Sequence, residues 1–526
     1  MRTQFTFTTM DLIGLVSLFI FVLTALTIAE VLRRKEIVGG STSRKIVHLS
    51  VGNVVLVFPF FFSNVWTALI GPIFFIPFTY FTSPASPIKK FRLKGVGEGH
   101  KYGTVYYAIS LTVLVGLFFY PDITNQSNVI LFASFIPLVW GDGMSAVIGT
   151  KFGEKSSYTI YGSTKSLLGS WTAAFATLGA VTVSCLILNQ SMRVAIYIGL
   201  LTGFITAIIE AITPKGFDNI AIPATNAIVL FILYTYVLQA DFENLNYVLS
   251  INSIISAGVI GLLLAILGIT FKALTWDGAI AGFYFGFIIL GLGSWTWGAM
   301  YVSFFFIGTL FTFVGKEKKK AATEEFEKGN TARDSVQAMV NSIVPSVLAF
   351  IAILVREPIL TIMAGGALAT SLSDTLGTEI GTLSKRKPRL STKPWKKVDA
   401  GTPGAISLLG LFASIVAAAV IAGIGFGVSY LDTYVVMHSS KLLFLIAVII
   451  GGFLGSYADS IFACTIQKMN RCQKCNRITE KSTHCDEKTI FHSGIEWMQN
   501  DVVNLFSVAI GAFFSAIVYI IGYSII

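Results

Sequence analysis

Long apolar runs separated by short polar loops dominate the chain. About sixteen runs of roughly 20 apolar residues recur between residues 11–32 and 502–526, and this is the length that crosses the hydrocarbon core of a bilayer. The pattern predicts an all-α polytopic membrane protein. The first run is long enough to span, and basic residues follow it rather than precede it, so we expect no cleavable signal peptide.

Composition supports this interpretation, because 54% of the 526 residues are hydrophobic and only 13% are charged. The net charge of +10 could suggest nucleic acid as a partner. If the spans alternate from an outside amino terminus, however, all but four of the 38 Lys and Arg residues fall on one side; the exceptions are Arg2, Arg193, Arg356 and Lys441. The positive-inside rule then places the basic loops in the cytoplasm and explains the charge without nucleic acid.

The stretch from Trp140 to Ser170 contains the first candidate chemistry. Asp142 lies near the end of a membrane-length run, and Lys165 and Ser166 precede the next run. An ionisable group in a spanning segment is costly to desolvate, so it is by default a functional candidate.

A basic motif precedes the second apolar run. Arg44 and Lys45 lie at its cytoplasmic mouth, and His48 follows one turn later. These cations lie at a helix amino terminus, where free N–H groups also point outward, and the combination predicts a phosphate site. Interfacial anchoring of Arg44 and Lys45 is the alternative and stays open.

Further acidic residues recur at the depth of Asp142. Glu210 ends one span, and Asp218 with Asn219 forms a short turn before the next. Carboxylates beside cations predict a magnesium–nucleotide site, because Mg²⁺ takes one or two carboxylates together with phosphate oxygens. An ion-pair network between helices is the alternative.

The second half repeats these motifs in the same order. The matched segments are Gly329 to Gln337 with Gly40 to His48, Asp374 and Gly381 with Asp142 and Gly149, Ser407 to Gly410 with Ser166 to Gly169, Asp459 with Glu210, and Asn500, Asp501 and Asn504 with Asp218 and Asn219. Arg44 precedes Asp142 by 98 residues, but Arg333 precedes Asp374 by 41, so the first half contains an extra hairpin of two spans. We therefore predict two homologous halves of the same orientation, residues 1–245 and 246–526, rather than an inverted repeat.

The second half also has its own cations and a cysteine-rich loop. Seven Lys and Arg residues between 385 and 397 could bind a polyphosphate or an anionic lipid surface, and lipid attraction suits most of them. Arg333 is the cation that we assign to the site, because Ile406 replaces Lys165.

The loop of residues 469–500 contains Cys472, Cys475, His484 and Cys485. These are the ligands of a closed structural Zn²⁺ site in a reducing compartment. His484 and Cys485 are adjacent, which leaves open whether both ligate, and His492 is the spare candidate.

Two family resemblances rest on these motifs. Residues 1 to about 240 resemble the phytol kinase and dolichol kinase family through Arg44, Lys45, His48, Gly52, Gly141, Asp142, Gly149, Phe152, Gly153, Lys165, Ser166, Gly169 and Ser170. Residues from about 250 to 526 resemble the phytyl-phosphate kinase family through Gly329 to Arg333, Ser373, Asp374, Glu379 to Gly381, Gly401 to Gly404, Ser407 to Gly410, Gly455, Asp459, Ser460, Asn500, Asp501 and Asn504.

The resemblances imply a bifunctional isoprenoid-lipid kinase. The first half would phosphorylate an isoprenoid alcohol from CTP or ATP with Mg²⁺, and the second would add a phosphate to the monophosphate. Asp142 and Asp374 would hold Mg²⁺ or orient the acceptor oxygen. The other expected catalytic residues are His48, Glu210 and Asp459, and the expected phosphate-binding residues are Arg44, Lys45, Lys165, Ser166, Arg333, Asp218, Asn219, Asn500, Asp501 and Asn504. His48 would accept a proton, a role that its counterpart Gln337 cannot take.

Two other functions remain open. A CTP-dependent cytidylyltransferase acting on a lipid phosphate would use similar surroundings. A transporter of phosphorylated isoprenoid lipids would suit the duplication, but the placement of the acids on one side argues against it.

Overall fold

A computed structural model describes the chain except for residues 1–5, 84–85, 87, 89–101, 161–162, 214–215, 239–249, 314–331, 356, 400–401, 433–440, 477, 482, 486 and 526. The described part is almost entirely helical and divides into two compact units, Met1–Leu249 and Ser250–Ile526. Within the described residues, 13 helices are long and apolar enough to cross a membrane, and Lys45–Phe61 and Gly103–Phe118 are shorter apolar helices. The predicted all-α polytopic membrane fold is confirmed.

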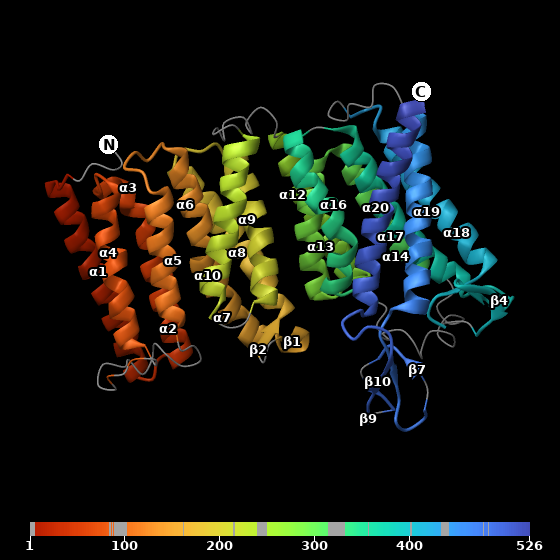
Figure 1. Cartoon of the computed structure of the whole chain (residues 1–526), viewed down its shortest axis with the longest axis horizontal. Coiled ribbons are helices and arrows are strands. Elements are labelled where there is room, and N and C mark those ends of the chain that lie inside the picture. The colour runs from red at the N-terminus through yellow and green to blue at the C-terminus, as the bar shows by residue number, and fades with distance from the viewer. Residues whose placement is uncertain are drawn as a thin grey trace. The chain divides into compact units, whose positions relative to one another are not determined.

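The first unit is a bundle of helices with one small β-hairpin (Figure 1). Its helices are α1 (Thr9–Arg34), α2 (Gly40–Gly52), η1 (Asn53–Val57), α3 (Phe58–Phe61), α4 (Val65–Thr82), α5 (Gly103–Phe118), α6 (Gln126–Ile136), η3 (Pro137–Asp142), α7 (Gly143–Phe152), η4 (Glu154–Ser156), α8 (Leu167–Ile187), α9 (Met192–Ile212), α10 (Asp218–Ile232) and η5 (Leu233–Val237). Strands β1 (Ser157–Ile160) and β2 (Ser163–Ser166) pair antiparallel between α7 and α8. Figure 1 shows this hairpin at the end of the unit where α2 begins and α7 ends.

The second unit has helices α12 (Ile251–Thr270), α13 (Trp276–Ile288), η6 (Ile289–Gly293), α14 (Trp295–Phe313), α16 (Ser335–Val355), α17 (Pro358–Gly381), α18 (Leu408–Val428), α19 (Lys441–Thr465) and α20 (Asn500–Ile525). A sheet of order β4-β3-β5 joins α17 to α18 and comprises β3 (Arg389–Leu390), β4 (Lys393–Lys397) and β5 (Ala405–Ile406). Five short strands join α19 to α20: β6 (Met469–Arg471), β7 (Ile478–Thr479), β8 (Thr483–His484), β9 (Glu487–Lys488) and β10 (Ile490–Ser493). The sheet order in this loop is β10-β6-β7, with β8 and β9 as a separate pair.

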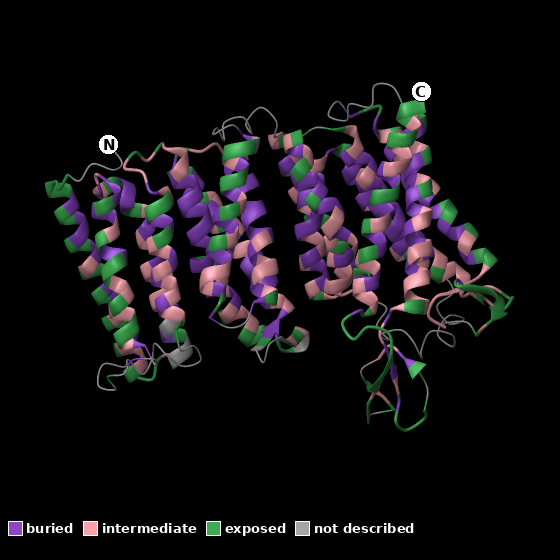
Figure 2. Cartoon of the chain, viewed as in Figure 1, coloured by how far each residue is buried: buried purple, intermediate pink, exposed green. Residues whose placement is uncertain are grey.

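One helix lies at the centre of each unit, and it is the helix that contains the predicted aspartate. The span Gln126–Phe152 is 83% buried and Pro358–Gly381 is 78% buried, whereas Thr9–Arg34 is only 28% buried. Figure 2 shows the same contrast between purple inner helices and the green outer face of α1. The apolar faces left exposed are those that a bilayer would cover.

Glycine allows the helices of the second unit to pack closely around α17. A Cβ atom on Gly511 of α20 would lie 1.9 Å from Oγ1 of Thr370, and one on Gly451 of α19 would lie 2.0 Å from Oγ of Ser515. Small residues of this kind let membrane helices approach and gain van der Waals contact. The tight packing brings α19 and α20 against the aspartate-bearing helix.

The helix that follows the hairpin or sheet starts in the same way in both units. Oγ of Ser166 accepts a hydrogen bond from the backbone N–H of Gly169 at 3.1 Å, and Oγ of Ser407 accepts one from Gly410 at 3.0 Å. Each hydroxyl also donates to the last turn of the central helix, to the carbonyl of Gly149 or Gly381. These are N-caps that satisfy free N–H groups and tie α8 to α7 and α18 to α17.

Candidate functional site

Asp142 is the last residue of a π-helical segment, η3, inside the central helix of the first unit. Such π-helical turns occur mostly as local insertions at functional sites. Glycines flank the aspartate and admit its neighbours: a Cβ on Gly141 would lie 2.5 Å from Oγ1 of Thr177, and one on Gly143 would lie 2.9 Å from Cδ2 of Leu49 on α2. The segment therefore brings Asp142 against the start of α2.

Lys45 and His48 meet Asp142 from α2. The Lys45 ammonium lies 2.9 Å from Oδ2 of Asp142 and donates a second hydrogen bond to its backbone carbonyl at 3.0 Å. Nδ1 of His48 lies 3.6 Å from the same Oδ2 atom, and the three side chains are largely buried. A buried charge needs a partner, and Lys45 provides it. The structure thus joins two predicted motifs that are 97 residues apart.

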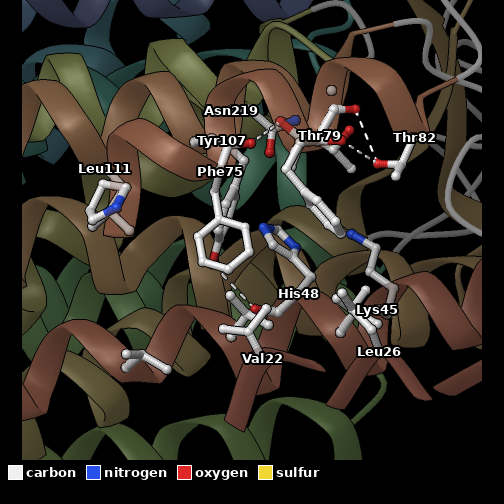
Figure 3. A pocket seen from close by; sticks show the side chains of 18 of the residues that line it. Val22, Leu26, Lys45, His48, Phe75, Thr79, Thr82, Tyr107, Leu111 and Asn219 are labelled. Carbon is white, nitrogen blue, oxygen red and sulfur yellow. Dashed lines mark hydrogen bonds between the residues drawn. The ribbon is translucent and has the colours of Figure 1, made fainter. Parts of the chain in front are cut away.

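A cavity opens beside this ion pair, with an empty volume of about 1310 Å³ that is partly open to the outside. Its apolar wall comes from α1, α2, η1, α3, α4 and α5 and includes Leu18, Val22, Val51, Phe75, Phe78 and Leu111. Its polar end contains Lys45, His48, Asp142, Asp218 and Asn219. Figure 3 shows His48 beside Phe75 and Tyr107, with Lys45 further along the same helix. The cavity is therefore amphipathic.

Asp218 and Asn219 reach the cavity from the first turn of α10. Oδ1 of Asp218 accepts the backbone N–H of Asn219 at 3.0 Å, and the carbonyl of Asn219 accepts the hydroxyl of Ser110 on α5 at 2.7 Å. Asp218 interacts electrostatically with Asp142, Lys45 and Lys165. Two carboxylates and two ammonium groups from four elements of the unit thus lie in one electrostatic cluster.

Lys165 pairs with Glu210 rather than with Asp142. Its ammonium lies 3.3 Å from Oε1 of Glu210 and also donates to the Glu210 backbone carbonyl, while Oγ of Ser170 donates to Oε2 at 2.9 Å. Tyr158, opposite Lys165 in the hairpin, donates its hydroxyl to the carbonyl of Ala211. Burial raises the pKa of Tyr158 to about 12, so the phenol is a neutral donor at physiological pH.

Arg44 and Ser166 are the remaining residues predicted for the first site. The side chain of Arg44 lies outside the described residues, so its place in the site stays a prediction. The hydroxyl of Ser166 caps α8 and contacts the carbonyl of Gly149. Ser166 therefore positions the helix that follows Lys165, whatever contact it makes with phosphate.

Asp374 of α17 meets Arg333 in the second unit. Arg333 precedes α16 and is fixed by its backbone, which donates from its N–H to the carbonyl of Ala273 at 2.9 Å. Its guanidinium lies 5.3 Å from the ring centre of Phe304 and interacts electrostatically with Asp374 and Glu379. The central aspartate of the second unit thus interacts electrostatically with a guanidinium.

Asp459 approaches Asp374 from α19. The two carboxylates interact electrostatically, and Oδ1 of Asp459 accepts the hydroxyl of Ser507 at 3.0 Å. Ser507 also donates to the carbonyl of Asn504, one turn earlier in α20. The hydroxyl of Ser507 therefore lies within hydrogen-bond distance of both the Asp459 carboxylate and the Asn504 carbonyl. Asn500 and Asp501 open the same helix, and their contact with substrate stays a prediction.

The basic cluster of residues 385–397 lies on an exposed sheet. All five residues of β4 are exposed, and Lys387 donates to Asp399 at 2.9 Å. The hydrogen bond and charge of Lys387 lower the pKa of Asp399. An exposed pair of this kind adds little stability, and the cluster suits an anionic surface better than a closed site.

Four side chains of the loop between α19 and α20 form a separate group, which we name the Cys/His tetrad: Cys472, Cys475, His484 and Cys485. Their ligand atoms all lie within 4.8 Å of one another. Adjacent residues His484 and Cys485 both belong to it, whereas His492, the spare candidate, is exposed on β10 outside it. The sequence left open whether both neighbours take part, and the structure brings both to one point.

The thiols of Cys472 and Cys485 differ in their pKa. The sulfur of Cys472 accepts the backbone N–H groups of Cys475 and Lys474, and the Cys475 bond is the main cause that lowers the pKa of Cys472 to about 6. Burial, with Cys475 and Cys472 nearby, raises the pKa of Cys485 to about 11. Oriented N–H groups stabilise a thiolate, so Cys472 becomes an anion more readily than Cys485 does.

The α4–α5 hairpin was missed as part of the site. The sequence identified it only as an extra hairpin, yet its two helices build much of the cavity wall. Tyr107 of α5 donates its hydroxyl to the carbonyl of His48 at 3.2 Å and packs its ring edge-on against the His48 ring. Helices α4 and α5 themselves contain no charged residue, so only the 98-residue spacing pointed to them, and the basic, glycine-rich turn that joins them, residues 89–101, lies outside the described residues.

The fold and these sites define the class of protein. The chain belongs to the DUF92 family of integral membrane proteins, whose family model matches residues 259–512. Protein PGR of Arabidopsis thaliana is 32% identical over 281 residues, which is 50% of this chain and 95% of that protein. An uncharacterised membrane protein of Methanocaldococcus jannaschii is 31% identical over 192 residues, 36% of this chain and 74% of that protein.

A relative with a named activity is similar over part of the chain. The phytol kinase of a Synechocystis strain is 29% identical over 208 residues, which cover 38% of this chain and 83% of that enzyme. No solved structure matches the chain. The chain is thus an integral, multi-pass membrane protein with a region similar to phytol kinase.

Proposed function

We propose that the first unit transfers a phosphoryl group from a nucleoside triphosphate to an isoprenoid alcohol. The observation that carries this proposal is the amphipathic cavity, whose apolar wall ends at the Lys45–Asp142 pair and His48. Similarity to a phytol kinase gives independent support, because that enzyme is named for the same kind of reaction. The proposed substrate is an alcohol of the geranylgeraniol, phytol or polyprenol class.

The cavity suits the two parts of such a substrate. The hydrocarbon tail packs among Val22, Phe75 and Leu111, where each buried methylene contributes about 0.8 kcal/mol. The hydroxyl then lies at the polar end, within reach of His48 and Asp142. A tail held in this way fixes the reacting oxygen and reduces the entropy cost of the transfer.

In the transfer step the alcohol oxygen forms a bond to the γ-phosphorus, and the bond from that phosphorus to the β,γ-bridging oxygen breaks. The nucleoside diphosphate leaves with the electron pair. The alcohol proton passes to His48, whose protonated ring Asp142 then stabilises at the 3.6 Å contact. Lys45 and Lys165 neutralise charge on the transferring phosphate, since phosphoryl transfer depends mainly on positioning and charge.

The residues present fit the Mg²⁺ ion that accompanies a nucleoside triphosphate. Asp142 and Asp218 line the same cavity and repel each other electrostatically, and Asp374 and Asp459 form a similar pair in the second unit. Such carboxylate pairs would hold the ion, which would supply charge neutralisation for the phosphates. We propose that the donor is CTP or ATP and that the sites face the cytoplasm, as the basic loops indicate.

For the second unit we propose transfer of a second phosphate to the prenyl monophosphate. Arg333 supports this assignment, because a guanidinium binds a phosphate dianion in a bidentate manner better than an ammonium does. An ionised phosphate oxygen needs no base, in keeping with Gln337 at the position of His48. The chain would then be a bifunctional kinase made of two fused, homologous domains.

Label transfer in the purified chain tests both steps. We expect label from the γ-position of CTP or ATP to appear first in the prenyl monophosphate and then in the diphosphate. Label from the α-position of CTP should stay out of the lipid, whereas a cytidylyltransferase would transfer it. Absence of transfer to both the alcohol and the monophosphate, in protein that retains its helical circular dichroism, would exclude the kinase function.

A further inference from the structure

The Cys/His tetrad lies at the tip of the loop between α19 and α20, and none of its four residues is among the proposed phosphoryl-transfer residues. We propose that the Cys/His tetrad binds one Zn²⁺ ion as a closed structural site and that the ion fixes the tip of this loop. The tip comprises the turn at Cys472–Cys475 and the β8–β9 hairpin.

The ligand set and its spacing match a tetrahedral zinc site. Three sulfurs and one imidazole are the donors that tetrahedral zinc sites use, and Zn–S bonds of about 2.3 Å separate neighbouring ligand atoms by about 3.5–3.8 Å. Nδ1 of His484 lies 3.4 Å from the sulfur of Cys475 and 3.2 Å from that of Cys485. One ring nitrogen therefore faces two sulfurs, and a single ion can lie among them.

The backbone of both turns is arranged to present these ligands. The N–H of Asn476, a residue with positive φ of 62°, closes the first turn onto the carbonyl of Cys472 at 3.0 Å. The N–H groups of Lys474 and Cys475 point at the sulfur of Cys472, as outer hydrogen bonds to a metal-bound thiolate do. The first turn is therefore organised around that sulfur.

Cys485 has an uncommon backbone conformation. Its φ is 53°, in the left-handed region that is unfavourable for a residue with a Cβ atom and that hairpin turns usually fill with Gly or Asn. A cysteine in this position sends its sulfur toward His484 and the first turn. Strained backbone of this kind clusters at ligand sites. The ion would offset the strain.

The base of the loop is held without the tetrad. Lys468 donates its N–H to the carbonyl of Met498 at 2.7 Å, and Ile495 donates to Ile466 at 3.0 Å. Gly494, with φ of 89°, passes so close to Gln467 that a Cβ atom would lie 2.0 Å from its carbonyl oxygen. The metal is thus expected to order the tip while the base and the membrane helices stay folded without it.

Metal analysis of the full chain, purified in detergent without chelator, tests the site. We expect about one zinc ion per chain and a loss of at least 80% of it in both Cys472→Ser and Cys475→Ser. Cys185→Ser is the matched control, because Cys185 is buried in α8 of the first unit and should leave the zinc content unchanged. Co²⁺ in place of Zn²⁺ should give the visible bands of a tetrahedral thiolate site. Zinc contents that do not differ between Cys472→Ser and Cys185→Ser would overturn the proposal.

Hydrogen exchange tests the role of the ion. Chelation should accelerate exchange of the amides in the tip at least tenfold and change those of Lys468 and Ile495 less than twofold. Equal exchange of the tip with and without zinc would overturn the structural role. A disulfide between two tetrad cysteines in protein extracted from membranes with its thiols protected from air would overturn the metal site itself.

Discussion

The two units place an aspartate on a central helix in the same way but balance its charge differently. Asp142 pairs with the Lys45 ammonium at 2.9 Å, whereas Asp374 faces the guanidinium of Arg333. The capped helix that follows is held alike in both, by Ser166 and by Ser407. The two units therefore share the acidic scaffold, and the described cation comes from neighbouring positions of the matched motif, because Arg333 aligns with Arg44, whose side chain lies outside the described residues, and Lys45 aligns with Asp334.

The position of the additional helices differs as well. In the first unit the α4–α5 hairpin lies between the basic motif and the central helix and forms much of the cavity wall. In the second unit α16 leads to α17 directly, and α13 and α14 come before the motif. The cavity described there has an empty volume of about 190 Å³ and is lined by Ser253, Ser256, Ala257, Leu290, Ser294 and Trp295, none of which is a predicted site residue. In the part of the chain that the structure describes, the large apolar compartment lies beside Asp142 of the first unit.

Exchange of each central aspartate for asparagine tests most directly whether the units act separately. Asp142→Asn should lower monophosphate formation by about 10²–10³-fold, the usual effect of removing one group that stabilises the transition state. It should leave conversion of supplied monophosphate to diphosphate intact. Asp374→Asn should do the reverse. Product analysis by thin-layer chromatography separates the two steps.

The controls for this pair are exposed carboxylates of the same units. Asp122→Asn in the first unit and Asp399→Asn in the second should change neither step, since both side chains lie in exposed turns. Loss of both steps in either central variant would mean that the units form one site, and the comparison between them would be wrong.

The Lys165–Glu210 pair has no counterpart in the second unit, where Ile406 replaces the lysine. Lys165→Met leaves a buried carboxylate without its cation and should reduce the free energy of unfolding of the first unit by about 3 kcal/mol. Labelling of the buried thiol of Cys185 during denaturation, read by mass spectrometry, reports this loss. Lys151→Met, at an exposed position of α7, is the control.

A second variant shows whether the loss comes from the unpaired charge. Lys165→Met combined with Glu210→Gln should recover part of the stability, because a neutral pair costs less to bury than a lone carboxylate. If the double variant is no more stable than Lys165→Met alone, the ion pair is not what stabilises this region.

The sequence predicted the fold, and it singled out residues that the structure brings close together, because spans and charges leave strong patterns. Apolar length indicated the helices, and the cost of burying Asp142 and Asp374 singled them out before any contact was known. The partners of Lys45 and Lys165 could not be predicted, since helix packing alone decides which acid each lysine meets. The role of Tyr107 was likewise invisible, because an aromatic residue in a spanning helix has no distinguishing pattern.

The cavity wall can be tested by filling it. Leu111→Trp should raise the KM for a C20 alcohol about tenfold and affect a short-chain alcohol less, because the added ring occupies space that the tail needs. Transfer to the monophosphate should stay unchanged. Val113→Trp, on the exposed face of the same helix, is the matched control. Equal KM values for the two variants would remove the cavity from the proposed reaction.

The smallest expected effect concerns the serine N-cap that both units share, Ser166 on α8 and Ser407 on α18. Ser166→Ala and Ser407→Ala should each lower the stability of the unit concerned by about 1 kcal/mol, the usual cost of losing an N-cap, whereas Ser→Gly at either position should cost only about a few tenths. Hydrogen exchange of the first turns of α8 and α18 measures both losses. If the cap is the common structural device, the two alanine variants behave alike even though the cations near them differ. A loss at Ser166 several times larger than at Ser407, together with a raised KM for the nucleotide, would instead indicate that the Ser166 hydroxyl contacts the phosphates of the donor.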